Sequence, residues 1–355
     1  MASLLDFLKS EDSPHLTHLS PKAAMPGGEV EAHGNNLGPT ELIPHATIGD
    51  IAAPTVLSRP TRATIRIPDG SISGDLVLHR NGHASNPLFL NVAVPMAENL
   101  HPIANPAVDA DQNVFATVSG PRGQQVPVSI FRIARDLQIR PFVRDLLNAS
   151  GLAFSPSGDL YASSRAEGTV YRIDATGEAT TFAEGLGIAT GLAFDPEGNL
   201  YVGDRSGTIF KIAPDRGLQI TAADRETFVF ATLEPSMAAY HLAFNSQGTL
   251  FVTAPNTSSN QAIHAIDPAG NTTLFYQGLG RPQGLAFDVD DNLYVAASLQ
   301  GQRGIIRITP TREASLTVSG QNLVGLAFLE DGCAALATRD ALFHIALDIE
   351  GRKLI

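Results

Sequence analysis

The chain repeats one short phrase, and this repetition limits its fold more than any other feature of the sequence. The phrase is an apolar run, a polar turn that contains glycine, and a second apolar run, as in GLAFSPSGDLYASS at 151–164 and GLAFDPEGNLYVGD at 191–204. Further copies begin at Asn105 (NPAVDADQNVFAT), His241 (HLAF), Gly284 (GLAF) and Gly325 (GLAF). The copies recur at intervals of 40 to 50 residues, so a unit of this length is repeated six times over about 100–355.

Each unit is expected to form four short β-strands. In the second unit the runs are Leu152–Phe154, Leu160–Ser163, Thr169–Ile173 and Ala179–Phe182, which are rich in β-branched and aromatic residues and are separated by turn residues. One such sheet cannot bury both of its faces, whereas sheets stacked in a closed ring can, so the repeat is typical of a β-propeller. The aromatic residues predicted to pack between neighbouring blades are Phe154, Phe194, Phe244, Phe287 and Phe328.

The repeated phrase resembles the NHL repeat and, more loosely, the regucalcin/gluconolactonase family of six-bladed propellers. The likeness covers the repeated region of the chain. That superfamily holds lyases, lactonases and pure binding modules, so the resemblance implies the fold and leaves the activity open.

The segment 17–97 lacks the phrase and reads as short strands between Gly, Pro and Asn turns, which predicts an antiparallel β-sandwich. The sequence of this segment resembles an IPT/TIG domain, an immunoglobulin-like module that serves for binding or as a spacer. The matching pieces are Leu19-Ser20-Pro21, Gly27-Gly28, the turn at Gly34–Leu37, Ile67-Pro68-Asp69-Gly70, Ser73-Gly74 and Asn81-Gly82.

The expected organisation is therefore all-β, with two domains. Residues 1–16 are expected to be a tail or short helix, 17–97 the sandwich and 98–355 a six-bladed propeller. The segment 93–104 contains two prolines, so it is expected to be a short, semi-rigid linker or the start of the first blade.

Charge and hydropathy exclude some partners. The net charge of −12 argues against nucleic acid, since phosphate binding needs a basic surface. The basic residues of the first domain are expected to be solvated strand edges: Arg59, Arg62, Arg66, His79 and Arg80. The sequence contains no run of 18 apolar residues, so no membrane span is predicted. The N-terminus has no basic region before its apolar residues, so no signal peptide is predicted and the cytoplasm is the expected compartment.

Ligands of a propeller bind in its central channel or on the loops at one end. The resemblance implies that the channel is lined at the start of each GLAF strand, so the predicted ligand-binding residues are Asn105, Ser150, Thr190, Tyr240, His241 and Gln283. An anion-binding end face is predicted from arginines that follow the second strand of three units: Arg165, Arg205 and Arg339.

Lactonases of the resembled family hold a divalent metal with carboxylate and Asn ligands in the channel. None of the residues that precede the phrase in this chain is a carboxylate, so we expect no metal and no other cofactor. Calcium or zinc belongs only to the alternative in which the protein is a lactone hydrolase or a propeller lyase. For that alternative the candidate acid and base groups are His101, Tyr240 and His241.

Three further features are expected to be structural. Asp204 is expected to bond to turn backbone, the acidic run 288–292 to be a blade turn, and Cys333 to be a buried core thiol. The favoured function is therefore a non-catalytic protein that binds a peptide, a protein or a carbohydrate across the end face of its propeller.

Overall fold

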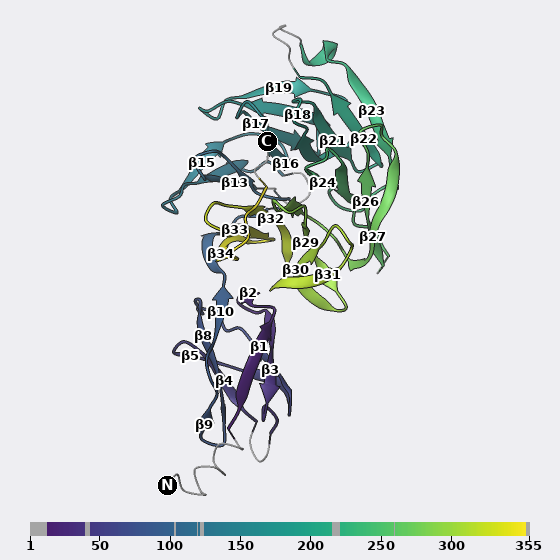
Figure 1. Ribbon diagram of the computed structural model, residues 1–355. Coiled ribbons are helices and arrows are strands. Elements are labelled where there is room, and N and C mark those ends of the chain that lie inside the picture. The colour runs from purple at the N-terminus through teal and green to yellow at the C-terminus, as the bar shows by residue number, and fades with distance from the viewer. Residues whose placement is uncertain are drawn as a thin grey trace, which may run out of the picture.

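The structure is a computed structural model that describes residues 13–39, 43–102, 104–118, 120, 124–214, 221–258 and 260–352. These residues form β-strands with one short 3-10 helix, η2 (Ala222–Asp224). The molecule is elongated, with a small N-terminal part attached to one side of a ring of sheets (Figure 1). Residues 1–12 of the predicted tail lie outside the described part, and the first strand begins at His15.

The N-terminal part is made of two sheets packed face to face. One sheet has the order β1 (His15–Ser20), β3 (Glu29–Asn35), β7 (Arg62–Arg66), β6 (Thr55–Arg59). The other contains β2 (Ala23–Ala24), β10 (Leu88–Val92), β8 (Gly74–Arg80), β4 (His45–Ile48), β5 (Ile51–Ala53) and, beside β8, β9 (His83–Ala84). Apolar residues from both sheets, such as Val30, Ile65, Leu76 and Leu90, form one buried cluster between them. In the longer strands β3, β7 and β8, alternate residues face this core, as the period of a strand requires.

The rest of the chain folds into sheets of four antiparallel strands. In chain order, the first sheet contains β12 (Ala107–Val108), β13 (Val114–Thr117), β14 (Ile130–Ile133) and β15 (Ile139–Val143), and the next contains β16 (Ala149–Phe154), β17 (Leu160–Ser164), β18 (Thr169–Ile173) and β19 (Ala179–Ala183). They are followed by a sheet of β20 (Ala189–Phe194), β21 (Leu200–Asp204), β22 (Thr208–Ile212) and β23 (Thr227–Thr232), and by one of β24 (His241–Phe244), β25 (Leu250–Thr253), β26 (Gln261–Ile266) and β27 (Thr272–Gly280). Then come β28 (Leu285–Phe287), β29 (Leu293–Leu299), β30 (Gln302–Ile308) and β31 (Ala314–Ser319), and the last sheet contains β32 (Leu323–Phe328), β33 (Cys333–Thr338), β34 (Ala341–Ala346) and the earlier strand β11 (Val94–Glu98). The first strand of each sheet lies toward the centre of the ring, and the last strand lies at the outside (Figure 1).

Aromatic pairs fill the joints between neighbouring sheets. Phe194 of β20 meets Tyr161 of the preceding sheet edge to face, with ring centroids 4.9 Å apart. Equivalent pairs are Phe154 with Phe115, Phe244 with Tyr201, Phe287 with Phe251 and Phe328 with Tyr294. Edge-to-face pairs at this distance add to the energy of burial. The predicted core role of the repeated phenylalanines is confirmed.

Close packing around the axis explains the glycine of the repeated phrase. A Cβ atom at Gly191 would lie 2.3 Å from the carbonyl oxygen of Tyr240 on the next sheet. A Cβ at Gly151 would lie 2.1 Å from the carbonyl oxygen of Thr190. Since both neighbours are backbone atoms, the inner strands approach one another too closely there for a side chain.

The ring closes through a strand from the far end of this region. β11 pairs antiparallel with β34, so a segment that precedes the first sheet completes the last one. The prediction that 93–104 is a linker or the start of the first blade is therefore wrong for 94–98, which form the outer strand of the last sheet. Closure of this kind satisfies an edge that would otherwise be open.

A second unexpected strand joins the two parts. β2 lies between β10 of the sandwich and β31 of the ring and pairs parallel with both. The backbone N–H of Met25 donates to the carbonyl of Ser319 at 2.8 Å, and the N–H of Glu29 donates to the hydroxyl of Ser319 at 2.9 Å. The side chain of Met25 is buried among apolar residues of the ring. Continuous strand pairing therefore fixes the two parts to each other.

Candidate functional site

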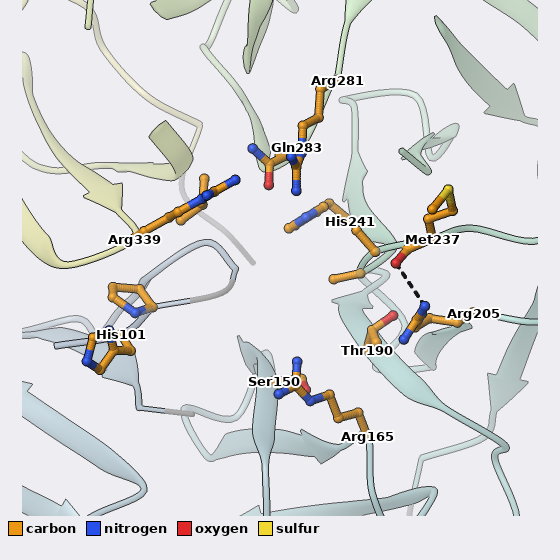
Figure 2. A pocket seen from close by; sticks show the side chains of 14 residues that line it. His101, Ser150, Arg165, Thr190, Arg205, Met237, His241, Arg281, Gln283 and Arg339 are labelled. Atoms are coloured by element: carbon orange, nitrogen blue, oxygen red, sulfur yellow. Dashed lines mark hydrogen bonds between the residues drawn. The ribbon is translucent and has the colours of Figure 1, made fainter. Parts of the chain in front are cut away.

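One end of the ring collects the residues that the repeat places at strand ends. Because the strands of each sheet are antiparallel, the first strands begin at the end where the second and fourth strands finish. A hollow of about 620 Å³ lies at this end (Figure 2). Its lining residues are His101, Pro102, Ser150, Arg165, Thr190, Arg205, Met237, Ala238, Ala239, His241, Arg281, Gln283, Val324 and Arg339.

Four arginines surround the mouth of the hollow. Arg165, Arg205 and Arg339 each follow the second strand of a sheet and were predicted to share a face, and the structure brings all three to the hollow. Arg281 is the fourth, and sequence reasoning missed it because it follows a fourth strand, β27, and belongs to no repeated position. Arg281 lies two residues before Gln283, a predicted channel residue, and this short separation is the sequence signal that could have placed it near the hollow.

At three of these arginines the guanidinium charge is not balanced by an ion pair within the described residues. Burial and, second, the charge of Arg205 lower the pKa of Arg165, although a guanidinium stays protonated at neutral pH. Arg205 donates from Nη2 to the carbonyl of Met237 at 2.8 Å. Its buried Nε atom has no hydrogen-bond partner among the described residues. Across the described part of the chain, no ion pair joins Arg205, Arg281 or Arg339 to a carboxylate.

The floor of the hollow is polar and uncharged. Ser150, Thr190 and Gln283, all predicted channel residues, lie there at the start of inner strands. The Thr190 hydroxyl donates to the carbonyl of Gly203 at 2.9 Å, and Gln283 donates from Nε2 to the carbonyl of Leu323 at 3.0 Å. The Ser150 hydroxyl donates to the carbonyl of Asn148. These bonds fix the floor and leave the Gln283 side-chain oxygen as an acceptor.

His241 also lines the floor and is almost fully buried, with 3% of its surface exposed. Burial lowers its pKa to about 4, so the imidazole is neutral at neutral pH. No hydrogen bond to the imidazole nitrogens occurs within the described residues. A neutral imidazole has one donor and one acceptor, and here both are available to a molecule in the hollow.

Two predicted channel residues do not reach the hollow. Asn105 donates from Nδ2 to the carbonyl of Leu285 at 2.8 Å and accepts from the N–H of Leu326 at 3.1 Å, so it joins inner strands of other sheets. Tyr240 is fully buried, and its hydroxyl donates to the carbonyl of Glu234. Burial, followed by the charges of Asp204 and Glu234, raises the pKa of Tyr240 to about 12. Adjacent side chains of an extended segment point in opposite directions, so Tyr240 and His241 do not form the expected pair.

His101, the third catalytic candidate, lies at the rim of the hollow. Its side chain is 61% exposed, and its Nδ1 atom lies 3.7 Å from a carboxylate oxygen of Asp340. The structure therefore brings His101 and His241 into one hollow, one at the mouth and one on the floor.

The donor set of this hollow does not suit a divalent cation. A calcium ion needs several oxygen ligands, and a zinc ion needs three or four nitrogen, sulfur or carboxylate ligands. The lining offers no carboxylate and no thiol, and four guanidinium groups would repel a cation. Within the described ranges no group of three or more His, Cys, Asp and Glu side chains is arranged to hold a metal.

The residues expected to be structural have the contacts of turns. Asp204 accepts from the backbone N–H of Ile188 at 2.8 Å, and Asp288 accepts from that of Asn292 at 2.8 Å. Cys333 is only half-buried at the start of β33, so the prediction of a core thiol is wrong. The first strand position after the turn leaves its side chain partly at the surface.

The basic residues of the sandwich are mostly engaged in local pairs. Arg62 and Arg66 lie 3.2 Å and 2.7 Å from the carboxylates of Glu31 and Glu29. Arg80 is buried and donates to the carbonyl of Gly38 at 2.7 Å. No helix in the described part of the chain is long and apolar enough to cross a bilayer.

Comparison with known proteins shows the fold. No family model matches the chain, and no curated protein matches it in sequence. A structure of a protein of unknown function from Bacteroides thetaiotaomicron is 13% identical, with a TM-score of 0.53 over 94% of this chain and 98% of that one. An auxiliary nutrient binding protein from the same organism is 12% identical, with a TM-score of 0.54 over 94% and 98%.

A gluconolactonase from Xanthomonas campestris is 15% identical, with a TM-score of 0.54 over 72% of this chain and 89% of that one. The first two likenesses extend over nearly the whole chain, including the N-terminal part, whereas this one covers a smaller share of it. At these identities a likeness carries the fold alone. The chain therefore contains a β-propeller like that of the gluconolactonase structure.

Proposed function

We propose that this protein binds a negatively charged ligand in the arginine-rimmed hollow without converting it. The observation that carries the proposal is the charge of the lining: its ionisable side chains are four arginines and two histidines, and none is acidic. An anion would form charge-assisted hydrogen bonds with these guanidinium groups. The whole chain has a net charge of −12, so the lining of the hollow has the opposite sign of charge to the molecule as a whole.

The electrostatic cost of this arrangement supports a binding role. Arg165 and Arg205 oppose each other's charge, and the buried Nε of Arg205 lacks a partner within the described residues. Such features destabilise a fold, and proteins keep them mainly where function needs them. A bound anion would offset the repulsion and satisfy the donors.

The proposed architecture has two modules. The sheets formed by β11 to β34 are the blades of a six-bladed, NHL-like propeller, and the strands from β1 to β10 are an IPT/TIG-like immunoglobulin module, which ends before β11 and is therefore shorter than the expected 17–97. The pairing of β2 with β31 supports a spacer role for this module, because it fixes the propeller at a set orientation.

The proposed function uses no metal ion and no organic cofactor. The lactone hydrolase alternative relies on a metal in the channel, and the lining residues do not suit one. The ligand is a small molecule or the acidic group of a peptide or carbohydrate. The name of the nutrient binding structure, which has a similar fold over both parts, supports capture of a small ligand.

Thermal unfolding in the presence of anions tests the proposal. A ligand that binds only the native state raises the melting temperature. Sulfate and citrate should raise it more for the wild type than for the double variant Arg281→Gln/Arg339→Gln. Arg303→Gln is the matched control, because Arg303 is exposed on β30 and does not line the hollow. Equal shifts in all three proteins, or hydrolysis of an aldonolactone that depends on added calcium or zinc, would contradict the proposal.

A further inference from the structure

We infer that the hollow takes a multianionic small molecule, with at least two separate carboxylate, phosphate or sulfate groups on a body that carries hydroxyl or carbonyl groups. The inference rests on the proposed function, because it assumes that the hollow binds an anion. It adds the number of charges on the ligand and the polarity of the part between them.

The number of charges follows from the spread of the arginines. Arg165 and Arg205 enter the mouth from one half of the rim, and Arg281 and Arg339 enter from the other half (Figure 2). They come from four separate loops, at the ends of β17, β21, β27 and β33. One carboxylate is matched by the two parallel donors of a single guanidinium. A ligand with one acidic group would therefore contact one half of the rim and make no charge-assisted contact with the other half.

The polarity of the body follows from the floor. His241 is buried and neutral and presents one donor and one acceptor, and Gln283 presents a side-chain oxygen. Ser150 and Thr190 already donate to backbone carbonyls. A hydroxyl group would suit the floor, since it can donate to one of these acceptors and accept from His241. A third anionic group would find no cation there.

The lining residues also make stacking on large aromatic side chains a poor explanation for recognition of the ligand. None of the described lining residues is Phe, Tyr or Trp, so the large aromatic rings that commonly stack on the apolar face of a sugar are not available. The volume of about 620 Å³ is that of a small-molecule pocket. Recognition by charge and hydrogen bonding is what these residues provide.

Matched pairs of probes test the inference by calorimetric titration of the full chain. Gluconate and glucarate share a carbon skeleton and differ in having one or two carboxylates. A hexose monophosphate and a hexose bisphosphate form the equivalent phosphate pair, and orthophosphate and tripolyphosphate a pair without a body. Sorbitol is the uncharged control. The carboxylate and phosphate pairs distinguish the two sources of anionic groups.

We expect the probe with more anionic groups to bind at least about tenfold more tightly in one or more pairs, the effect of one added charge-assisted contact. Arg165→Gln and Arg339→Gln, one from each half of the rim, should each remove that preference, whereas Arg303→Gln should keep it. His241→Phe should weaken glucarate and leave tripolyphosphate unchanged, because only glucarate has hydroxyl groups.

The outcomes separate the inference from the proposed function. If the probe with one anionic group binds as tightly as its partner in every pair, the inference is wrong and the proposed anion site stands. If only one of the two substitutions, Arg165→Gln or Arg339→Gln, weakens binding of the probe with more anionic groups, the inference is also wrong. When no probe binds to the wild type, both are wrong.

Discussion

Asn105 and His241 occupy the same position of the repeat, the one at which the other inner strands have glycine, and they have different surroundings. The Asn105 side chain bonds to the backbone at Leu285 and Leu326 and fills space beside Gly284 and Gly325. The His241 side chain enters the hollow and has no bond partner among the described residues. One departure from the repeat therefore links two inner strands, and the other forms part of the floor of the candidate site.

The buried imidazole of His241 makes stability depend on pH. Its folded pKa of about 4 lies below the ordinary value of 6.5, so the unfolded chain binds more protons between these values. Stability is therefore complete above pH 6.5 and falls as the pH drops toward 4, by about 3 kcal/mol at 1.36 kcal/mol per pKa unit. Urea unfolding from pH 4 to 8 should show this loss in the wild type and a smaller one in His241→Gln. His101→Gln is the control and should behave like the wild type, because His101 is exposed; identical slopes for all three proteins would exclude His241 as the cause.

Arg165 and Arg205 should show a repulsive coupling. Either substitution by Gln removes the same repulsion, and the double variant can gain from its removal only once. The free energy of unfolding of the double variant should therefore be about 0.5 kcal/mol lower than the value obtained by adding the two single effects to the wild type. Denaturant unfolding of the four proteins of the cycle measures this difference. A bound multianion should reduce the coupling or reverse its sign. Strict additivity without ligand would show that the two charges do not interact.

The inner strands should not tolerate a side chain at Gly191. Its Cβ would lie 2.3 Å from the carbonyl oxygen of Tyr240, so Gly191→Ala is expected to cost about 2 kcal/mol through overpacking against backbone. Gly74→Ala is the control, since a Cβ there meets no atom closer than 3.6 Å. Both variants are compared by urea unfolding. Equal stability of the two would contradict the close approach of the inner strands.

The strand β11 should be required for the stability of the ring. Ala97 is buried in it beside the last sheet, so Ala97→Asp would place an unpaired carboxylate among apolar residues and should cost at least about 2 kcal/mol. Glu98→Gln, on the exposed neighbour, should change stability by less than about 0.5 kcal/mol. Chemical unfolding measures both effects, and a small loss in Ala97→Asp would show that closure by β11 matters little.

The sequence predicted what the repeat determines locally. Phe194 and its counterparts lie between sheets because the same phrase makes the same contact in each unit, and Arg165, Arg205 and Arg339 share a face because they follow the same strand. The pairing of β11 with β34 and of β2 with β31 joins residues far apart in the chain, and no local pattern encodes such pairing.

Side-chain direction was the other limit of sequence reasoning. Tyr240 precedes a channel histidine and has the chemistry of an acid, yet it points away from the hollow and bonds to the backbone. Arg281 lies outside every repeated position, so its presence at the rim depended on where the loop after β27 turns. Both outcomes depend on the path of single loops, which composition and spacing do not specify.

Diffraction from crystals soaked in selenate tests the central claim most directly, because the anomalous signal of selenium locates the anion. The strongest peak is expected in the hollow, within hydrogen-bond distance of guanidinium groups among Arg165, Arg205, Arg281 and Arg339. Peaks only at other arginines, with none in the hollow, would contradict the account.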